Sequence, residues 1–144
     1  MKQPDVQAAR WLRQAEHDLS IAERHLKENC YSDCCFMSEQ TAQKALKAYL
    51  FAQGERSVFE HSVFRMITRA REHDAAFAAL RERGSILDQY YIPTRYPDAL
   101  AEPAVPFESY TNAQASEALA FAREFVGLVQ HKLGISPTSS STGA

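Results

Sequence analysis

The segment from Ser32 to Gly54 constrains this chain most, because it has the pattern of one long helix with apolar side chains on more than one side. Ser32 is a suitable N-cap, no proline or internal glycine interrupts the segment, and Gly54 suits a left-handed helix end. At about 100° per residue, one broad face carries Cys35, Ala42, Ala45, Leu46, Tyr49 and Ala52. The other face carries Glu39, Gln40, Gln43 and Lys47, with Phe36, Leu50 and Phe51 at its ends. We therefore expect this helix to have neighbours on several sides, from its own bundle or from a second chain.

Helical periodicity continues on both sides of this segment. Apolar residues recur every three or four positions over residues 5–29 and 62–72, and the short connection after Asn29 predicts an antiparallel hairpin of the first two helices. Asp74 is predicted to cap a short helix that ends at Gly84. Ser85 with Asp88 forms a weaker capping pair for a short piece that follows.

The final helix has the clearest signals at both ends. Thr111 and Gln114 form a capping box, and helical spacing continues to Gly134. No segment alternates with the period of a strand. The predicted fold is therefore all-α, an antiparallel up-and-down helical bundle with four or five main helices over residues 5–134. Residues 135–144 are polar, rich in Ser and Thr, and predicted to be a disordered tail.

The bulk composition favours one domain in a reducing compartment. The chain has 144 residues, 45% of them hydrophobic, and its net charge of −2 creates no global field that would attract nucleic acid or lipid. The three cysteines lie close together without a CxxC motif, so they predict small core residues and neither a disulfide framework nor a metal site. No apolar run is long enough to span a bilayer, so we expect a cytoplasmic protein that uses no cofactor and no membrane.

Three fragments together resemble the small prokaryotic HEPN domains (higher eukaryotes and prokaryotes nucleotide-binding). They are WLRQAEHDLSIAERHL at 11–26, EQTAQKALKAYLFAQG at 39–54 followed by His61-Ser62, and YYIPTRYPDAL at 90–100. The resemblance covers roughly residues 5–134. It implies an antiparallel helical bundle, usually homodimeric, often encoded beside a minimal nucleotidyltransferase partner in a toxin–antitoxin-like system. It also implies metal-independent ribonuclease activity in some members and nucleotide binding in others.

The sequence departs from the ribonuclease pattern of this family, which is an Arg and a His separated by four to six residues, shortly before the final helix. Arg95 is the Arg in that region, and no His follows it there. Arg56 with His61 and Arg10 with His17 have permitted spacings, but about one such pair is expected by chance in this composition. Gln43 also stands where many relatives have Glu. These departures favour a protein that is not an enzyme.

Residues 92–110 contain four prolines and no helical pattern, so they predict a long loop, and long loops in compact domains are often functional. The predicted ligand-binding residues are Arg95, Tyr91, Tyr96, Lys44 and Lys47, because a guanidinium, ammonium groups and aromatic faces suit a nucleotide or RNA. A ribonuclease that uses Arg95, Tyr96 and Asp98 is one alternative, and a stand-alone bundle that binds a small nucleotide is another. Arg95 could also have a purely structural role, in an ion pair with Asp98 or Glu39.

His61, with Glu39 and Gln40, is predicted to belong to a structural polar cluster. Its ring could cap the third helix or bond across to the second. Arg65, Arg69 and Arg71 are interpreted as a solvated face and not as an RNA surface.

Overall fold

The computed structural model describes residues 4–135 and contains only helices in that range. The helices are α1 (Pro4–Lys27), α2 (Tyr31–Ala52), α3 (Val63–His73), α4 (Arg81–Asp88) and α5 (Asn112–Leu133), with 3-10 helices η1 (Ala75–Leu80), η2 (Pro97–Ala99) and η3 (Pro106–Glu108). The predicted all-α bundle is confirmed. Of the predicted tail, only Ile135 is among the described residues, and the remainder lies outside them.

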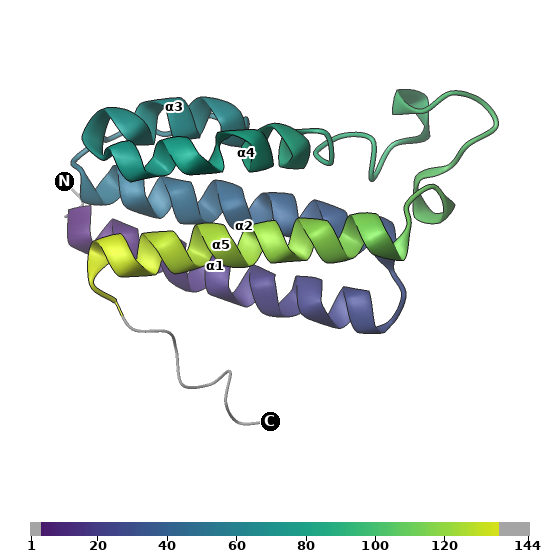
Figure 1. Cartoon of the computed structure of the whole chain (residues 1–144), viewed down its shortest axis with the longest axis horizontal. Coiled ribbons are helices and arrows are strands. Elements are labelled where there is room, and N and C mark those ends of the chain that lie inside the picture. Colours follow the sequence, from purple (N-terminus) through teal and green to yellow (C-terminus); the bar gives the residue numbers. More distant parts are fainter. Residues whose placement is uncertain (1–3, 136–144) are drawn as a thin grey trace.

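Helix α2 is the centre of the bundle (Figure 1). It packs against α1 and α5 on one side and against α3 and α4 on the other. Its polar stripe is consequently buried: the exposed fraction is 0% for Glu39, 3% for Gln43 and 8% for Lys47. The prediction of neighbours on more than one side is confirmed, and helices of the same chain provide them.

The ends of the two long inner helices follow the predicted capping chemistry with one exception. Helix α2 begins at Tyr31, one residue before the predicted cap Ser32, and its N-cap Cys30 makes no side-chain capping bond. Gly54 has the expected positive φ of 93° after α2. The capping box of Thr111 and Gln114 is present on α5, and Gly134 ends that helix with a φ of 66°.

Gly84 does not end a helix, which corrects the prediction from sequence. It lies inside α4, and a Cβ at this position would be 2.4 Å from Cδ1 of Ile67 and 3.2 Å from Cγ1 of Val63. The glycine is therefore needed because α3 and α4 approach closely. The predicted capping pair of Ser85 with Asp88 is also wrong, because α4 already begins at Arg81 and Asp88 is its last residue.

The loop between α4 and α5 extends beyond the end of the helical bundle (Figure 1). It contains η2 and η3 and is otherwise irregular, as the prolines predicted.

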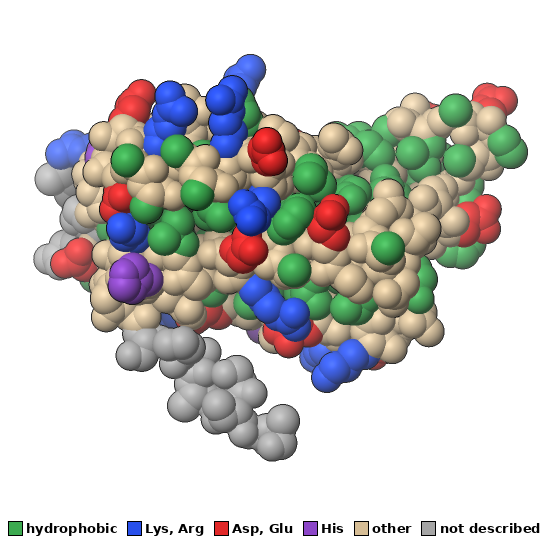
Figure 2. Space-filling model, in the orientation of Figure 1, with side chains coloured by type: hydrophobic (Ala, Val, Ile, Leu, Met, Phe, Trp, Pro, Cys, Tyr) green, Lys and Arg blue, Asp and Glu red, His purple; other side chains and the backbone are tan. Residues whose placement is uncertain are grey.

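Figure 2 shows acidic and basic side chains interspersed over one face of the molecule. Arg69 pairs with Glu55, and Arg65 lies 3.9 Å from Glu60, which agrees with a solvated α3 surface. No helix within residues 4–135 is long and apolar enough to cross a membrane.

Candidate functional site

Arg95 is surrounded by three aromatic rings on the loop and on α2. Its guanidinium carbon lies 4.3 Å from the ring centre of Phe36 and 5.0 Å from the ring centres of Tyr91 and Tyr96. The Arg95 side chain is nevertheless exposed to solvent, and Tyr96 is 52% exposed. The structure thus presents a cation and aromatic surface to solvent together.

The orientation of Arg95 is fixed by its own loop. Nε and Nη2 donate to the carbonyl oxygen of Tyr91 at 2.9 and 2.7 Å. The buried Thr94 donates its hydroxyl to the carbonyl of Tyr90 at 2.6 Å, and the backbone N–H groups of Arg95 and Tyr96 both donate to Ile92. A guanidinium carries five N–H donors, so three remain for a ligand. The side chain is preorganised and not saturated.

The predicted ion pair of Arg95 is not formed. Neither Asp98 nor Glu39 makes a salt bridge or hydrogen bond to it, and no other carboxylate between residues 4 and 135 does so. Asp98 is exposed on η2. The charge of Arg95 therefore remains available at the surface.

His61 packs against the same tyrosine as Arg95. The rings of His61 and Tyr91 are stacked, with centres 5.4 Å apart and an interplanar angle of 15°. His61 does not cap α3, which corrects that prediction: the cap is Ser62, whose hydroxyl accepts from the backbone N–H of Arg65 at 3.1 Å. We call the five residues Phe36, His61, Tyr91, Arg95 and Tyr96 the Arg95 cluster.

Asp88 connects the two segments of the chain that carry His61 and Tyr91. Its carboxylate accepts hydrogen bonds from the Ser62 hydroxyl at 2.7 Å and from the backbone N–H groups of Val63 and Phe64 at 2.6 and 3.2 Å. These two N–H groups lie in the first turn of α3 and have no partner within that helix. Asp88 ends α4 shortly before Tyr91, so one carboxylate fixes the start of α3 beside the tyrosine.

Glu39 is a buried carboxyl on α2 close to the Arg95 cluster. It accepts hydrogen bonds from Gln40, at 2.9 Å, and from Gln43. Burial raises the pKa of Glu39 to about 7, an effect that these two hydrogen bonds and the charge of Arg95 reduce and that Asp88 reinforces. Since Glu39 is fully buried, it cannot contact a ligand, but its charge influences the site next to it.

Lys44 and Lys47 do not join the Arg95 cluster. Lys44 forms an ion pair with Asp18 of α1, which is itself 3% exposed. The Lys47 ammonium lies 5.3 Å from the ring centre of Trp11, and burial lowers the pKa of this lysine. Both lysines thus have partners on α1 and lie apart from Arg95, and their predicted role as ligand-binding residues stays a prediction.

Sequence reasoning missed two members of the site. Phe36 is an apolar residue at the edge of a polar stripe, and that position is the signal that could have indicated a contact with the loop. The role of Asp88 had no usable signal, because its partners in α3 are distant in sequence.

Arg10 and His17, the other pair with a permitted Arg–His spacing, line a shallow hollow of about 340 Å³ on α1 with Arg13 and Gln14.

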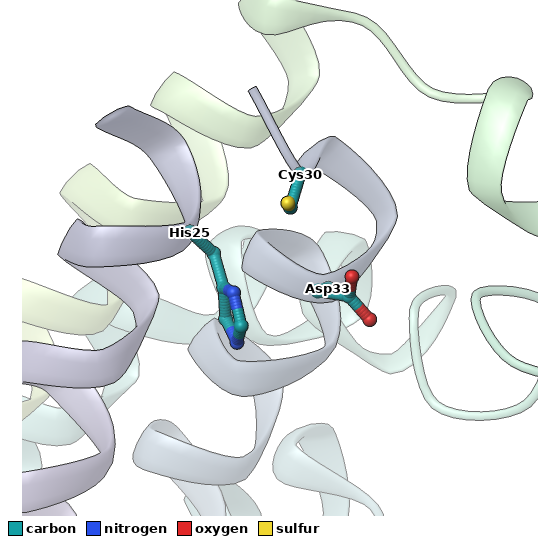
Figure 3. A group of neighbouring side chains, drawn as sticks. All are labelled: His25, Cys30 and Asp33. Carbon is teal, nitrogen blue, oxygen red and sulfur yellow. The ribbon is translucent and has the colours of Figure 1, made fainter. Parts of the chain in front are cut away.

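The only side chains among residues 4–135 that are grouped like a set of metal ligands lie elsewhere. They are His25, Cys30 and Asp33 at the turn between α1 and α2 (Figure 3). The Arg95 cluster instead has the donors and rings that suit a phosphate and an aromatic base.

The chain belongs to the HEPN domain family, whose sequence model matches residues 8–132. The crystal structure of TT1696 from Thermus thermophilus is similar, with a TM-score of 0.82 and 36% identity over 88% of this chain and 98% of that one. The crystal structure of ST0689, an archaeal HEPN homologue, has a TM-score of 0.73 and 32% identity over 92% of this chain and 98% of that one. The resemblance seen in the sequence is confirmed.

Two further proteins are similar in sequence. The protein named "Putative toxin MJ1304" from Methanocaldococcus jannaschii is 28% identical over 128 residues, which cover 83% of this chain and 84% of that protein. Human sacsin is 29% identical over 113 residues, 76% of this chain, but the match spans only 2% of sacsin.

Proposed function

We propose that this HEPN domain is a binding module that holds a nucleotide, or the end of a single-stranded RNA, at the Arg95 cluster. The observation that supports the proposal best is the environment of Arg95: an exposed guanidinium, held among three aromatic rings, without a carboxylate partner in the described part of the chain. A cation that is ordered but unpaired is suited to an anion from outside the chain.

The two kinds of group in the cluster would recognise different parts of such a ligand. The free N–H donors of Arg95 would bind phosphate oxygens, and hydrogen bonds to charged groups contribute about 1.5 to 3 kcal/mol each. The exposed face of Tyr96 would stack on a base, for which about 1 to 3 kcal/mol is typical. Because stacking tolerates any base, this arrangement predicts binding with little sequence preference.

Calorimetric titration with AMP, ATP and a short single-stranded RNA tests the proposal. Arg95→Ala should weaken binding by at least about 10-fold, which is what the loss of one charge-assisted hydrogen bond implies. Arg95→Lys keeps the charge but loses the planar fork, so it should rescue binding only in part. Arg71→Ala removes an exposed arginine on α3 and should leave affinity unchanged. Absence of heat at millimolar ligand, or equal affinity of wild type and Arg95→Ala, would contradict the proposal.

The proposal includes a homodimer and a nucleotidyltransferase partner, and family membership supports both. Sedimentation at micromolar concentration should give a species of twice the 16.2 kDa chain mass, and a 16.2 kDa species would refute the dimer. Co-expression with the product of an adjacent nucleotidyltransferase gene should give a complex that copurifies. A partner that separates completely at low salt would argue against the association.

Metal-independent ribonuclease activity is the second candidate, and the stacking of His61 on Tyr91 is the observation that favours it. This contact brings an imidazole to the ring that also carries Arg95. An imidazole could take the proton of a ribose 2′-hydroxyl as the 2′-oxygen bonds to phosphorus and the 5′-oxygen leaves with a proton from water. The guanidinium could stabilise the negative charge that develops on the phosphate oxygens. The similarity to a protein named as a toxin agrees with this alternative.

The two candidates make different predictions for His61→Ala. If the chain is a ribonuclease, labelled RNA should be cleaved in the presence of EDTA, and both His61→Ala and Arg95→Ala should abolish cleavage. If it is a binding module only, no cleavage occurs, and His61→Ala should weaken RNA binding less than Arg95→Ala does. Cleavage that persists in both variants would indicate a contaminating nuclease and refute the second candidate.

A further inference from the structure

We propose that His25, Cys30 and Asp33 bind a divalent transition metal ion of the zinc type at the turn between α1 and α2 (Figure 3). Each residue contributes one ligand atom, and the imidazole nitrogen, the thiol sulfur and the carboxylate oxygen all lie within 4.8 Å of one another. None of these residues belongs to the Arg95 cluster, so this inference does not depend on the proposed function. It reverses the expectation from sequence that the cysteines bind no metal.

The backbone of the turn holds the three residues in place. His25 lies in the last turn of α1, Asp33 in the first turn of α2, and Cys30 between the two helices. Asn29 has a φ of 63°, which reverses the chain, and the N–H of Cys30 donates to the carbonyl of His25 at 2.8 Å. The spacing matches no metal motif in the sequence because the turn, and not a repeated interval, brings the ligands together.

The donor set selects the class of metal. Nitrogen, sulfur and oxygen together suit Zn²⁺ or Co²⁺, whereas Mg²⁺ and Ca²⁺ require oxygen ligands. Zinc–ligand bonds of about 2.0 to 2.3 Å place two ligand atoms about 3.5 Å apart in a tetrahedral site. Figure 3 shows the Asp33 carboxylate directed outward, so this exposed side chain must rotate toward the other two.

Metal binding would cost the turn little of its present bonding. The Cys30 thiol now makes a weak hydrogen bond to the carbonyl of Glu28 at 3.7 Å, and it would release its proton to water when it binds the metal. Three protein ligands leave a fourth position for water. Cys34 and Cys35 are 0% exposed, so Cys30 is the thiol that a metal ion can reach from solvent.

Cobalt titration of the tag-free full-length chain, reduced with a phosphine, tests the site. Co²⁺ bound to a thiolate gives a charge-transfer band in the near ultraviolet, and Zn²⁺ should remove that band by displacement. Zn²⁺ should also slow the reaction of Cys30 with Ellman's reagent, which tests the site without any substitution. Urea unfolding should show that the metal stabilises the chain, by about 100-fold in the unfolding equilibrium at a concentration of 100 times Kd.

Variants identify the ligands. Cys30→Ser should remove the thiolate band. His25→Ala and Asp33→Asn should each weaken metal binding by at least about 10-fold, because substituting even a residue that only hydrogen-bonds to a metal ligand typically weakens metal affinity by that factor. His131→Ala and Asp98→Asn, both at exposed positions, should leave affinity unchanged. The proposal is overturned if no band forms at millimolar Co²⁺, if the band survives Cys30→Ser, or if neither His25→Ala nor Asp33→Asn weakens binding.

Discussion

The buried carboxyl of Glu39 should make the free energy of unfolding of this chain decrease as pH rises from about 4.5 to about 7. The pKa is about 7 in the folded chain and 4.5 for a free side chain, because burial disfavours the charged form. The folded state therefore binds this proton more tightly than the unfolded state. The resulting stabilisation is fully present below about pH 4.5, is lost progressively as pH rises, and is gone above about pH 7. The two pKa values correspond to a loss of roughly 3 kcal/mol.

Glu39→Gln isolates this effect because the amide does not titrate. Urea unfolding of wild type and variant at pH 5, 6, 7 and 8 gives a difference in the free energy of unfolding at each pH. Between pH 5 and pH 8 this difference should shift in favour of the variant by roughly 2 to 3 kcal/mol. Rearranged hydrogen bonds with Gln40 and Gln43 would add an offset that is nearly independent of pH.

The same series on Glu72→Gln provides the control, since Glu72 is exposed on α3. Its difference from wild type should stay within about 0.5 kcal/mol at every pH. A flat difference for Glu39→Gln, or one that moves in the opposite direction, would refute the reasoning that burial raises the pKa of this carboxyl.

Three further predictions concern packing, capping and thiol reactivity. Gly84→Ala should destabilise the chain by about 1 kcal/mol in urea unfolding, because the clash with Ile67 exceeds the gain in helix propensity. Gly127→Ala, where a Cβ meets nothing within 4 Å, should instead stabilise it by roughly 0.5 to 1 kcal/mol. The same sign for both substitutions would contradict the packing argument. Asp88→Ala should cost about 2 to 3 kcal/mol of stability and weaken RNA binding. Glu82→Ala, which removes an exposed carboxylate on α4, should do neither. If Asp88→Ala binds RNA as wild type does, Asp88 has no positioning role. Ellman's reagent at neutral pH should label Cys30 alone in the folded chain, since burial raises the pKa of Cys34 to about 11 and of Cys35 to about 12. Rapid reaction of all three thiols without denaturant would show that the packing of α2 around Cys34 and Cys35 opens.

The sequence predicted those parts of the fold that depend on local chemistry. The capping box of Thr111 and the glycines at positions 54 and 134 specify helix ends through contacts a few residues away, so they could be read directly. Gly84 was misinterpreted because a glycine that ends a helix and a glycine that admits a neighbouring helix look the same in one dimension. The distinction depends on Ile67, which lies on another helix.

The candidate site could be predicted only in part for the same reason. Arg95, Tyr91 and Tyr96 share one loop, so their proximity followed from their spacing. Phe36 lies on α2 and His61 lies in the loop just before α3, and their place in the cluster depends on how the helices pack. The lysines do not lie in the Arg95 cluster because their partners, Asp18 and Trp11, lie on α1, which no pattern within α2 could reveal.

The carboxylate of Asp88 has a mechanical consequence for the surface of the molecule. Moving the end of α4 away from the start of α3 would deprive three donors of their shared acceptor at once, and two of them are backbone N–H groups that have no partner within α3. Small, independent displacements of the two backbone segments that carry His61 and Tyr91 are therefore disfavoured. A ligand at this surface therefore meets the Arg95 cluster either intact or disrupted together with the first turn of α3.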